Sequence, residues 1–409
     1  MYFILHKIFL VSSLFNYFAY YVISFFPNIL DRMVNLTVIT HTRVNLHEYT
    51  DSSFSGEDSI ILRYHKSFAH DINLDLLKSI SIKEGCRIIG PLNYKNTNIY
   101  ILDMASLMAD GNFKSSVSCV AVARSMEQGA QGLVACSSGN TGTAIARYTK
   151  NQKFKSYIFI PEISLNKLDF SVIDDNIHKV KIINKPEWEV HAYAKNFAEE
   201  NGLPFVPSIS HQFEANSCRT MFTLEYMVEN DITFDWTSQA ISGGHGPLGF
   251  YKKFYSLINE GLQINSLPGF IGVQQSSVCP MYNAWIDARD TLTEEDINLY
   301  PNDIMEPTLY STRPDSNYNY LYKIIKNNGG TFYCIDHPEY IRLEKTMLNI
   351  INSAGIKLKT KRIQNDAVIT EKAGILSGMG ILKAIEDGLI LPSENVLLTF
   401  TGTTESPII

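Results

Sequence analysis

Apolar residues along the chain follow two alternating spacings. Short runs of β-branched and aromatic residues, typical of strands, are followed by longer segments in which apolar positions recur every three or four residues, as in helices. The expected strands are residues 98–102, 133–136, 157–160, 180–183, 239–242, 270–274, 331–335 and 396–400. Because most of them have a helical segment nearby, the pattern predicts βαβ units, a mostly parallel sheet and an α/β fold.

The clearest expected helix covers residues 115–128. Val117, Val120 and Ala121 recur at helical spacing, and Gly129 is a suitable residue to end the helix. Further helices are expected over residues 188–200, 219–229, 338–351 and 369–387. The polar stretch 287–314 interrupts this pattern and is expected to be a long surface excursion.

Size and charge restrict the classes of protein to consider. The 409 residues are enough for two or three domains, and 45% hydrophobic and 19% charged residues are ordinary for an enzyme with sizeable cores. The formal net charge is -7 and no run of Lys or Arg occurs, so no nucleic-acid partner is expected, because such a partner requires a basic surface. The six cysteines include no C-x-x-C pair, so neither a metal site nor a disulfide framework is expected.

The first 32 residues differ from the rest of the chain. Residues 8–30 carry no charge and are long enough to cross a bilayer, which takes roughly 20 apolar residues. Three interpretations stay open: an upstream start with Met33 as the working initiator, a membrane anchor, or a packed or signal-like extension. A cytoplasmic protein is expected, with membrane contact only through this leader if the leader is genuine.

Lys114 is the first candidate for chemistry. It ends the segment Asp110-Gly111-Asn112-Phe113-Lys114, at an expected junction of a loop and a helix. A lysine that is partly desolvated can hold an aldehyde as a Schiff base, because its neutral amine is then accessible. The ordinary alternative is a solvated lysine in the first turn of a helix.

Two glycine-rich turns each follow an expected strand and precede a helix. The run Ser138-Gly139-Asn140-Thr141-Gly142 can offer several N–H groups to a carboxylate, and the Asn140 amide can donate to a ring oxygen. The run Gly243-Gly244-His245-Gly246 lets the backbone approach a phosphate at a helix start. An ordinary capped turn is the alternative in both places. Cys136, just before the first turn, is expected to be a small apolar strand residue rather than a nucleophile.

A fourth element, Thr401-Gly402-Thr403, follows the last expected strand. A hydroxyl at this place can face the nitrogen of a pyridine ring, whereas an acidic partner would keep that nitrogen protonated. An uncharged partner weakens the ring as an electron sink, which favours elimination and replacement over transamination. Simple turn residues are the alternative.

These four elements, in this order, resemble those of the fold type II pyridoxal phosphate (PLP) enzymes, the tryptophan-synthase-β-like group. Within that group the chain looks most like threonine synthase, because the segments Arg63-Tyr64-His65-Lys66 and Asn166-Lys167-Leu168 resemble stretches of that enzyme. The resemblance spans roughly residues 61–405. It implies two domains with mostly parallel sheets flanked by helices, an active site between them, and pyridoxal 5'-phosphate as the cofactor.

The resemblance also implies domain boundaries and residue roles. Residues 33–104 and 203–409 would form the larger, cofactor-binding domain, and residues 105–202 the smaller, substrate-gripping domain, with residues 1–32 as the leader. The implied cofactor ligands are Lys114, which holds the cofactor and moves protons, Asn140, the phosphate loop Gly243, Gly244, His245 and Gly246, and Thr401 at the ring nitrogen. The implied ligands of the substrate carboxylate are Ser138, Gly139 and Thr141.

The resemblance implies a small amino-acid substrate and a homodimer. Threonine synthesis from phosphohomoserine is the first expectation. A serine or threonine dehydratase, or a cysteine-synthase-like enzyme, would have the same cofactor site and stays open. Ser115-Ser116 and His245 differ from the usual family residues and favour a third reading, a catalytically idle protein that binds PLP. Arg219 lies in an expected helix but not at the spacing of a ligand for a substrate phosphate.

Overall fold

The computed structural model describes residues 44–264, 266–363, 366–402 and 404. The predicted leader, residues 1–32, lies outside this range, as do Met33 and Thr403. None of the helices built from the described residues combines the length and the apolar character needed to span a membrane.

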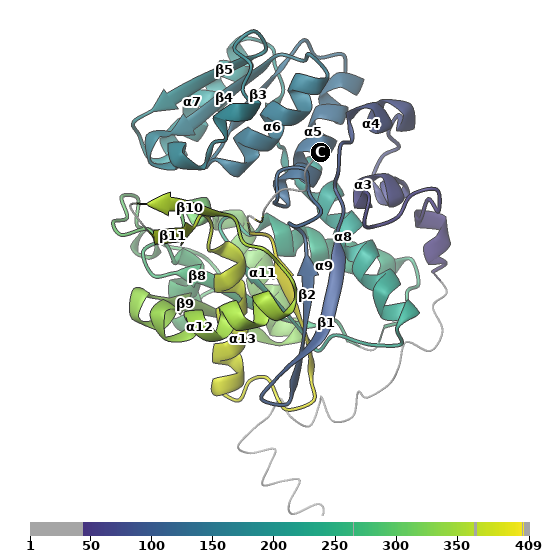
Figure 1. Ribbon diagram of the computed structural model, residues 1–409, viewed down its shortest axis with the longest axis vertical. Helices are drawn as coiled ribbons and strands as arrows, with labels where there is room; N and C mark the ends of the chain where they lie inside the picture. Colours follow the sequence, from purple (N-terminus) through teal and green to yellow (C-terminus); the bar gives the residue numbers. More distant parts are fainter. Residues whose placement is uncertain (1–43, 265, 364–365, 403, 405–409) are drawn as a thin grey trace, which may run out of the picture.

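Six strands form the larger sheet, in the order β1-β2-β12-β7-β8-β9 (Figure 1). Their bounds are β1 (Arg87–Tyr94), β2 (Thr97–Asp103), β7 (Trp236–Ala240), β8 (Gly269–Gln275), β9 (Gly330–Ile335) and β12 (Asn395–Phe400). Strand β1 pairs antiparallel with β2, and the other neighbours are parallel. The sheet confirms the predicted α/β class, although β1 was not predicted and β7 ends two residues earlier than expected.

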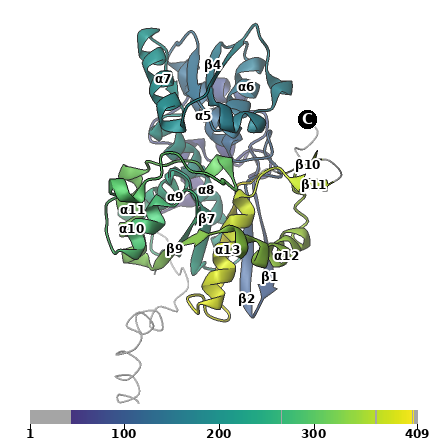
Figure 2. The same ribbon diagram turned by 90° about the vertical axis from the view of Figure 1, so that its left-hand side faces the viewer.

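A second sheet of four parallel strands has the order β5-β4-β3-β6. Its members are β3 (Leu133–Cys136), β4 (Ser156–Pro161), β5 (His178–Ile183) and β6 (Phe205–Val206). The two sheets, each with its helices, occupy opposite ends of the molecule in Figures 1 and 2. The domain boundaries stay a prediction; β6 lies just beyond the expected boundary at residue 202, yet it pairs with β3.

Eleven α-helices belong to the described residues. They are α3 (Ile60–Arg63), α4 (Leu74–Ile80), α5 (Lys114–Glu127), α6 (Asn140–Asn151), α7 (Glu187–Glu200), α8 (Ile209–Glu229), α9 (His245–Asn259), α10 (Pro280–Ile286), α11 (Asp315–Asn328), α12 (His337–Ser353) and α13 (Ala373–Glu386). Short 3₁₀ segments are η1 (Leu46–Tyr49), η2 (His65–Ser67), η3 (Glu162–Lys167), η4 (Phe170–Val172), η5 (Glu294–Asp296) and η6 (Pro307–Leu309).

Two predicted helices have different bounds in the structure. Helix α8 begins ten residues earlier than expected, because Ser208 and His211 form a capping box at its start. The expected helix 369–387 begins only at Ala373, because residue 369 ends strand β11 (Asp366–Ile369), which pairs with β10 (Thr360–Ile363). Glu371 therefore lies just before a helix instead of inside one.

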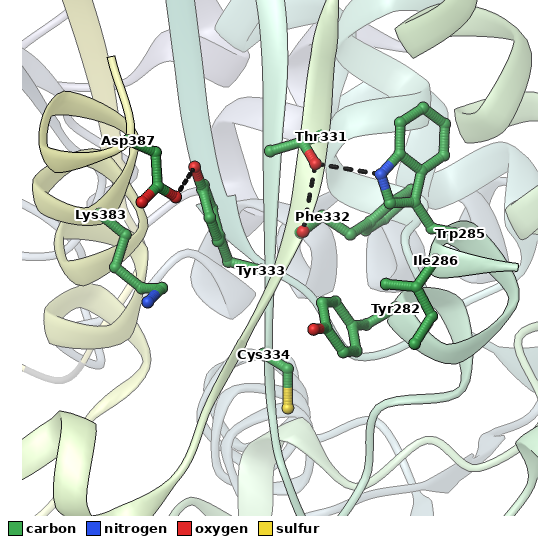
Figure 3. A pocket seen from close by; sticks show the side chains of 9 residues that line it. All are labelled: Tyr282, Trp285, Ile286, Thr331, Phe332, Tyr333, Cys334, Lys383 and Asp387. Atoms are coloured by element: carbon green, nitrogen blue, oxygen red, sulfur yellow. Dashed lines mark hydrogen bonds between the residues drawn. The ribbon is translucent and has the colours of Figure 1, made fainter. Parts of the chain in front are cut away.

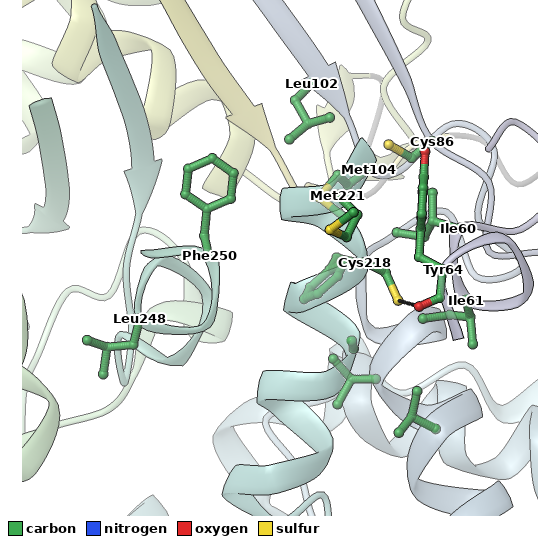
Figure 4. Close-up of a cluster of buried hydrophobic side chains, with 14 of the residues drawn as sticks. Ile60, Ile61, Tyr64, Cys86, Leu102, Met104, Cys218, Met221, Leu248 and Phe250 are labelled. Atoms are coloured by element: carbon green, nitrogen blue, oxygen red, sulfur yellow. Dashed lines mark hydrogen bonds between the residues drawn. The ribbon is translucent and has the colours of Figure 1, made fainter. Parts of the chain in front are cut away.

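Alternating side chains of the larger sheet contribute to two hydrophobic cores. Phe270 and Leu397 belong to the core that also contains residues of α8, α9 and α11, whereas Ile271 and Leu398 belong to the core under α12 and α13. Figure 4 shows part of the first core, where Cys218 and Met221 of α8 lie near Tyr64 and Leu102. Helix α8 also packs against α9, where Thr220 Oγ1 donates to the Phe250 carbonyl at 2.9 Å.

The predicted surface excursion over residues 287–314 is confirmed only in part, because residues 287–300 are mostly exposed whereas many of residues 301–314 are buried. Asp296, Glu306, Leu309 and Thr312 within it are buried. Asp296 is held by Arg289, and the Glu306 backbone N–H donates to Gln275 Oε1 at 2.9 Å. The polar character of Asp296 and Glu306 therefore reflects buried polar interactions rather than exposure to solvent.

Candidate active site

Lys114 is the first residue of α5, as expected from its place after a loop. Its backbone N–H donates to Asn112 Oδ1 at 2.9 Å, which fixes the turn into the helix. Gly111 has φ of +65°, and a Cβ there would lie 2.5 Å from the carbonyl oxygen of Thr404. The Thr404 N–H donates to the Gly111 carbonyl at 2.9 Å, so the loop before Lys114 contacts the segment after β12.

The Lys114 ammonium has two charged or polar neighbours from distant parts of the chain. Burial lowers its pKa, and the Glu371 carboxylate opposes this by raising it. Burial, together with the positive charge of Lys114, lowers the pKa of His245 to about 4, so that imidazole is neutral at pH 7. Lys114 therefore has the desolvated environment that keeps an amine reactive.

The Asn140 turn connects β3 to α6. Ser137 Oγ accepts from the N–H groups of Gly139 at 2.9 Å and of Gly142 at 2.6 Å. Gly139 has φ of +122°, which an L side chain rarely adopts. The Asn140 amide donates to Glu371 Oε2 at 2.6 Å, and Glu371 also acts on Lys114. Asn140 and Lys114 thus face the same carboxylate.

The other predicted residues of this turn lie beside Asn140. Thr141 follows it in the first turn of α6 and is buried, whereas Ser138 is half-buried. Gly139 precedes it, and a Cβ there would lie 2.2 Å from the Cβ of Lys167. Substrate contact by these three residues stays a prediction.

The predicted phosphate loop connects β7 to α9. Gly244 takes a left-handed conformation with φ of +79° just before His245 begins the helix. The Asn317 amide donates to the Gly243 carbonyl, and Gly246 has no room for a Cβ because Gln239 Nε2 would lie 2.6 Å from it. The first N–H groups of a helix have no partner within the helix, so this end can receive an anion.

Thr401 follows β12 and is half-buried. The next residue, Gly402, lies against the start of α13, because a Cβ on Gly402 would be 3.2 Å from the Gly374 nitrogen. Glu371 lies two residues before this helix. The structure thus brings the Thr401 segment to the same region as Glu371, and its role toward a ring nitrogen stays a prediction.

Glu371 and Glu306 were not identified from the sequence. Glu371 is 4% exposed and Glu306 1% exposed. Lys167 Nζ donates to Glu306 Oε1 at 2.9 Å, and the Lys372 N–H donates to Glu306 Oε2 at 2.6 Å. Through these two hydrogen bonds, Glu306 joins η3, beside the smaller sheet, to the start of α13. The apolar periodicity placed Glu371 inside the expected helix 369–387, so it gave no signal for this residue.

Two other features do not belong to this site. Burial raises the pKa of the Cys136 thiol, which supports its interpretation as a strand residue rather than a thiolate nucleophile. A cavity of about 570 Å³ lies beside the edge strand β9 (Figure 3), where Trp285 Nε1 donates to Thr331 Oγ1 at 3.0 Å. Its lining comes from α10, β9 and α13 and includes none of the predicted site residues.

Comparison with known proteins gives a consistent result. The family model described as "Pyridoxal-phosphate dependent enzyme" matches residues 95–402. Two curated relatives are named cysteate synthase. The one from Methanocorpusculum labreanum is 22% identical over 345 residues, covering 78% of this chain and 76% of the relative. The one from Methanosarcina barkeri is 24% identical over 338 residues, covering 76% and 77%.

Solved structures share the fold at low identity. Maize serine racemase has a TM-score of 0.57 at 14% identity, covering 82% of this chain and 94% of that one. Holo diaminopropionate ammonia lyase from Escherichia coli has a TM-score of 0.56 at 14% identity, covering 87% and 92%. These similarities confirm the fold of two mostly parallel sheets flanked by helices.

Proposed function

Because the chain belongs to the family of pyridoxal-phosphate-dependent enzymes, we propose that it eliminates or replaces a substituent on the side chain of a small amino acid. The cofactor of this family is pyridoxal 5'-phosphate. The observation that carries the proposal is that Lys114 and Asn140 both interact with Glu371. His245, which follows the glycine turn before α9, also interacts electrostatically with Lys114.

The residues present fit this cofactor. The lowered pKa of Lys114 provides an amine able to join an aldehyde, and the glycine turn before α9 provides an end of a helix for a phosphate. When bound, the cofactor supplies a ring that withdraws electrons from the substrate's α carbon. The hydroxyl of Thr401 would face the ring nitrogen, which would then have no acidic partner.

The chain's own groups would then bind the substrate and move protons. Lys114 Nζ, once released by the substrate's amine, would accept the proton of the α carbon and later return it. The N–H groups around Ser138, Gly139 and Thr141 would bind the substrate carboxylate. Glu371 would orient the Asn140 amide and stabilise the positive charge that Lys114 gains with the proton.

The substrate is the finer part of the proposal. The two curated relatives above are named cysteate synthase, so our first expectation, threonine synthesis from phosphohomoserine, receives no support from them. We favour replacement at the β carbon. To make cysteate in this way, an anionic leaving group departs from the β carbon with the bonding electron pair, and sulfite sulfur forms the new C–S bond with its lone pair.

A panel of substrates tests this choice. O-phosphoserine and phosphohomoserine differ by one methylene, and serine, threonine and O-acetylserine complete the panel, each with sulfite, sulfide or water. Mass spectrometry of the products should show cysteate only with a β-substituted substrate and sulfite. Threonine from phosphohomoserine would restore the first expectation, a keto acid with ammonia would identify a dehydratase, and no turnover with any member would identify an idle protein.

Lys114 has a direct test. Borohydride reduction of the holoprotein should fix the cofactor to the Lys114 peptide, and Lys114→Ala should lose this adduct and at least about 10³-fold in turnover. Lys195→Ala is the matched control, because the Lys195 side chain is 59% exposed on α7. Full activity of Lys114→Ala would contradict the assignment.

A further inference from the structure

Arg219 is a buried cation close to the predicted phosphate loop. It lies on α8 with an exposed fraction of 1%. Its Nη2 donates to the Gly246 carbonyl at 2.7 Å, and its Nη1 donates to Gln239 Oε1 at 2.9 Å. The guanidinium carbon lies 4.8 Å from the centre of the Phe250 ring. Arg219 therefore holds the first turn of α9 and the end of β7 together.

The charge of Arg219 is not balanced within the described part of the chain. Its Nε is buried and has no hydrogen-bond partner there, and its electrostatic neighbours are Cys86 and Tyr251 rather than a carboxylate. Burial lowers the pKa of Arg219 to about 9, which still leaves the guanidinium charged at pH 7. A buried charge without a counterion destabilises a fold.

Arg124 shows the usual arrangement for a buried arginine in the same protein. Its Nη2 lies 2.8 Å from Glu214 Oε1, and its Nη1 lies 2.9 Å from Glu127 Oε2. Both arginines lie in helices of the same core region, since α5 packs against α8. Arg219 therefore differs from Arg124 in having no carboxylate among its neighbours in the described part of the chain. It lies beside the start of α9, where an anion can bind.

We propose that Arg219 is the internal countercharge for the phosphate group bound at the start of α9. Arg219 acts as a positioning residue: it holds the Gly246 carbonyl and Gln239 and adds a fixed positive charge behind the loop. This inference rests on the proposed function, which assigns residues 243–246 to the phosphate. Its consequence is that a phosphate dianion stabilises the apoprotein and that the cofactor is selected by its phosphate.

The test compares pyridoxal 5'-phosphate with pyridoxal, which lacks the phosphate. Dissociation constants are measured with apoprotein of the wild type, Arg219→Met, Arg219→Lys and Arg124→Met. The preference of the wild type for the phosphorylated form should fall about 10-fold or more in Arg219→Met, while binding of pyridoxal stays the same. Arg219→Lys should keep part of the preference, because it retains the charge.

Thermal unfolding of the apoproteins with added inorganic phosphate gives a second readout. Phosphate should raise the midpoint of the wild type and of Arg124→Met but leave Arg219→Met unchanged. An unchanged preference in Arg219→Met, or equal stabilisation by phosphate, would overturn the inference. If Arg219→Met does not fold, Arg219→Lys decides: a preference below that of the wild type supports the inference, and a preference equal to that of the wild type overturns it.

Failure of the proposed function gives a different result. In that case the wild type itself would not form a borohydride-stable adduct at Lys114. An intact adduct with an unchanged preference in Arg219→Met would reject only the role of Arg219.

Discussion

The Asn140 amide donates a 2.6 Å hydrogen bond to Glu371, although the two residues are 231 positions apart. Asn140 begins α6 beside the smaller sheet, and Glu371 precedes α13 on the larger one. The same carboxylate raises the pKa of Lys114. Glu371 thus links a residue expected to bind the cofactor ring to the amine expected to hold the cofactor.

Removing the charge of Glu371 should change the pH dependence of cofactor capture. Burial lowers the pKa of Lys114 and Glu371 raises it, so Glu371→Gln should lower that pKa further. More of the amine is then neutral at a given pH, and the rate at which the apoprotein captures pyridoxal 5'-phosphate should reach its plateau at lower pH. Stopped-flow absorbance measures this profile. Glu187→Gln, which changes a half-buried carboxyl of α7, should leave it unchanged, and an upward shift in Glu371→Gln would refute the prediction.

His245 should make the fold sensitive to acid. Burial and the charge of Lys114 lower its pKa from 6.5 to about 4. Between these values the unfolded chain binds a proton at this histidine and the native protein does not, so stability falls as pH falls from 6.5 to 4. His245→Asn cannot titrate and should lose less stability over that window. Urea unfolding of the apoproteins at several pH values measures the difference; equal slopes for both proteins would contradict the assignment.

Glu306 should be important for stability because it is buried and paired. The side chains of Lys167 and Glu306 are 10% and 1% exposed. Glu306→Gln leaves the buried Lys167 ammonium without a carboxylate, although it still donates to the Thr370 carbonyl, and this should lower the free energy of unfolding by about 3 kcal/mol. Glu294→Gln is the control, because the exposed Arg313–Glu294 pair should contribute less than about 1 kcal/mol. Similar losses in the two variants would show that burial of the first pair is irrelevant.

Two glycines with positive φ allow the effect of a steric clash to be separated from the effect of the backbone conformation. Gly139→Ala should destabilise the protein by about 3 kcal/mol or more, because its Cβ would lie 2.2 Å from the Lys167 Cβ. Gly129→Ala should lose only about 1 kcal/mol, since nothing lies within 4 Å of its Cβ. Thermal unfolding measures the loss of stability in both variants. Equal losses would mean that Lys167 moves away from the new Cβ at little cost.

Local patterns predicted the elements that carry the candidate site. Leu133–Cys136 and the glycine turn after it follow directly from a β-branched run ending in turn residues. Lys114 was expected at a helix start, where the structure places it. These features depend on neighbours in sequence, so a sequence contains the information for them.

Features that depend on distant contacts were missed. Glu371 was expected inside a continuous helix, and its role follows only from its interactions with Asn140 and Lys114. Glu306 fell in a polar stretch that looks exposed until its partner Lys167, 139 positions away, is known. Burial of a charged residue depends on tertiary partners, which hydrophobic periodicity does not report.

The hydrogen bond from Thr404 to Gly111 has a practical consequence for handling this protein. A substitution at Thr404 would act on Gly111, three residues before Lys114, the amine proposed to hold the cofactor. Such a change is expected to alter cofactor loading. Changes to Thr404 should therefore be interpreted as changes to the candidate active site.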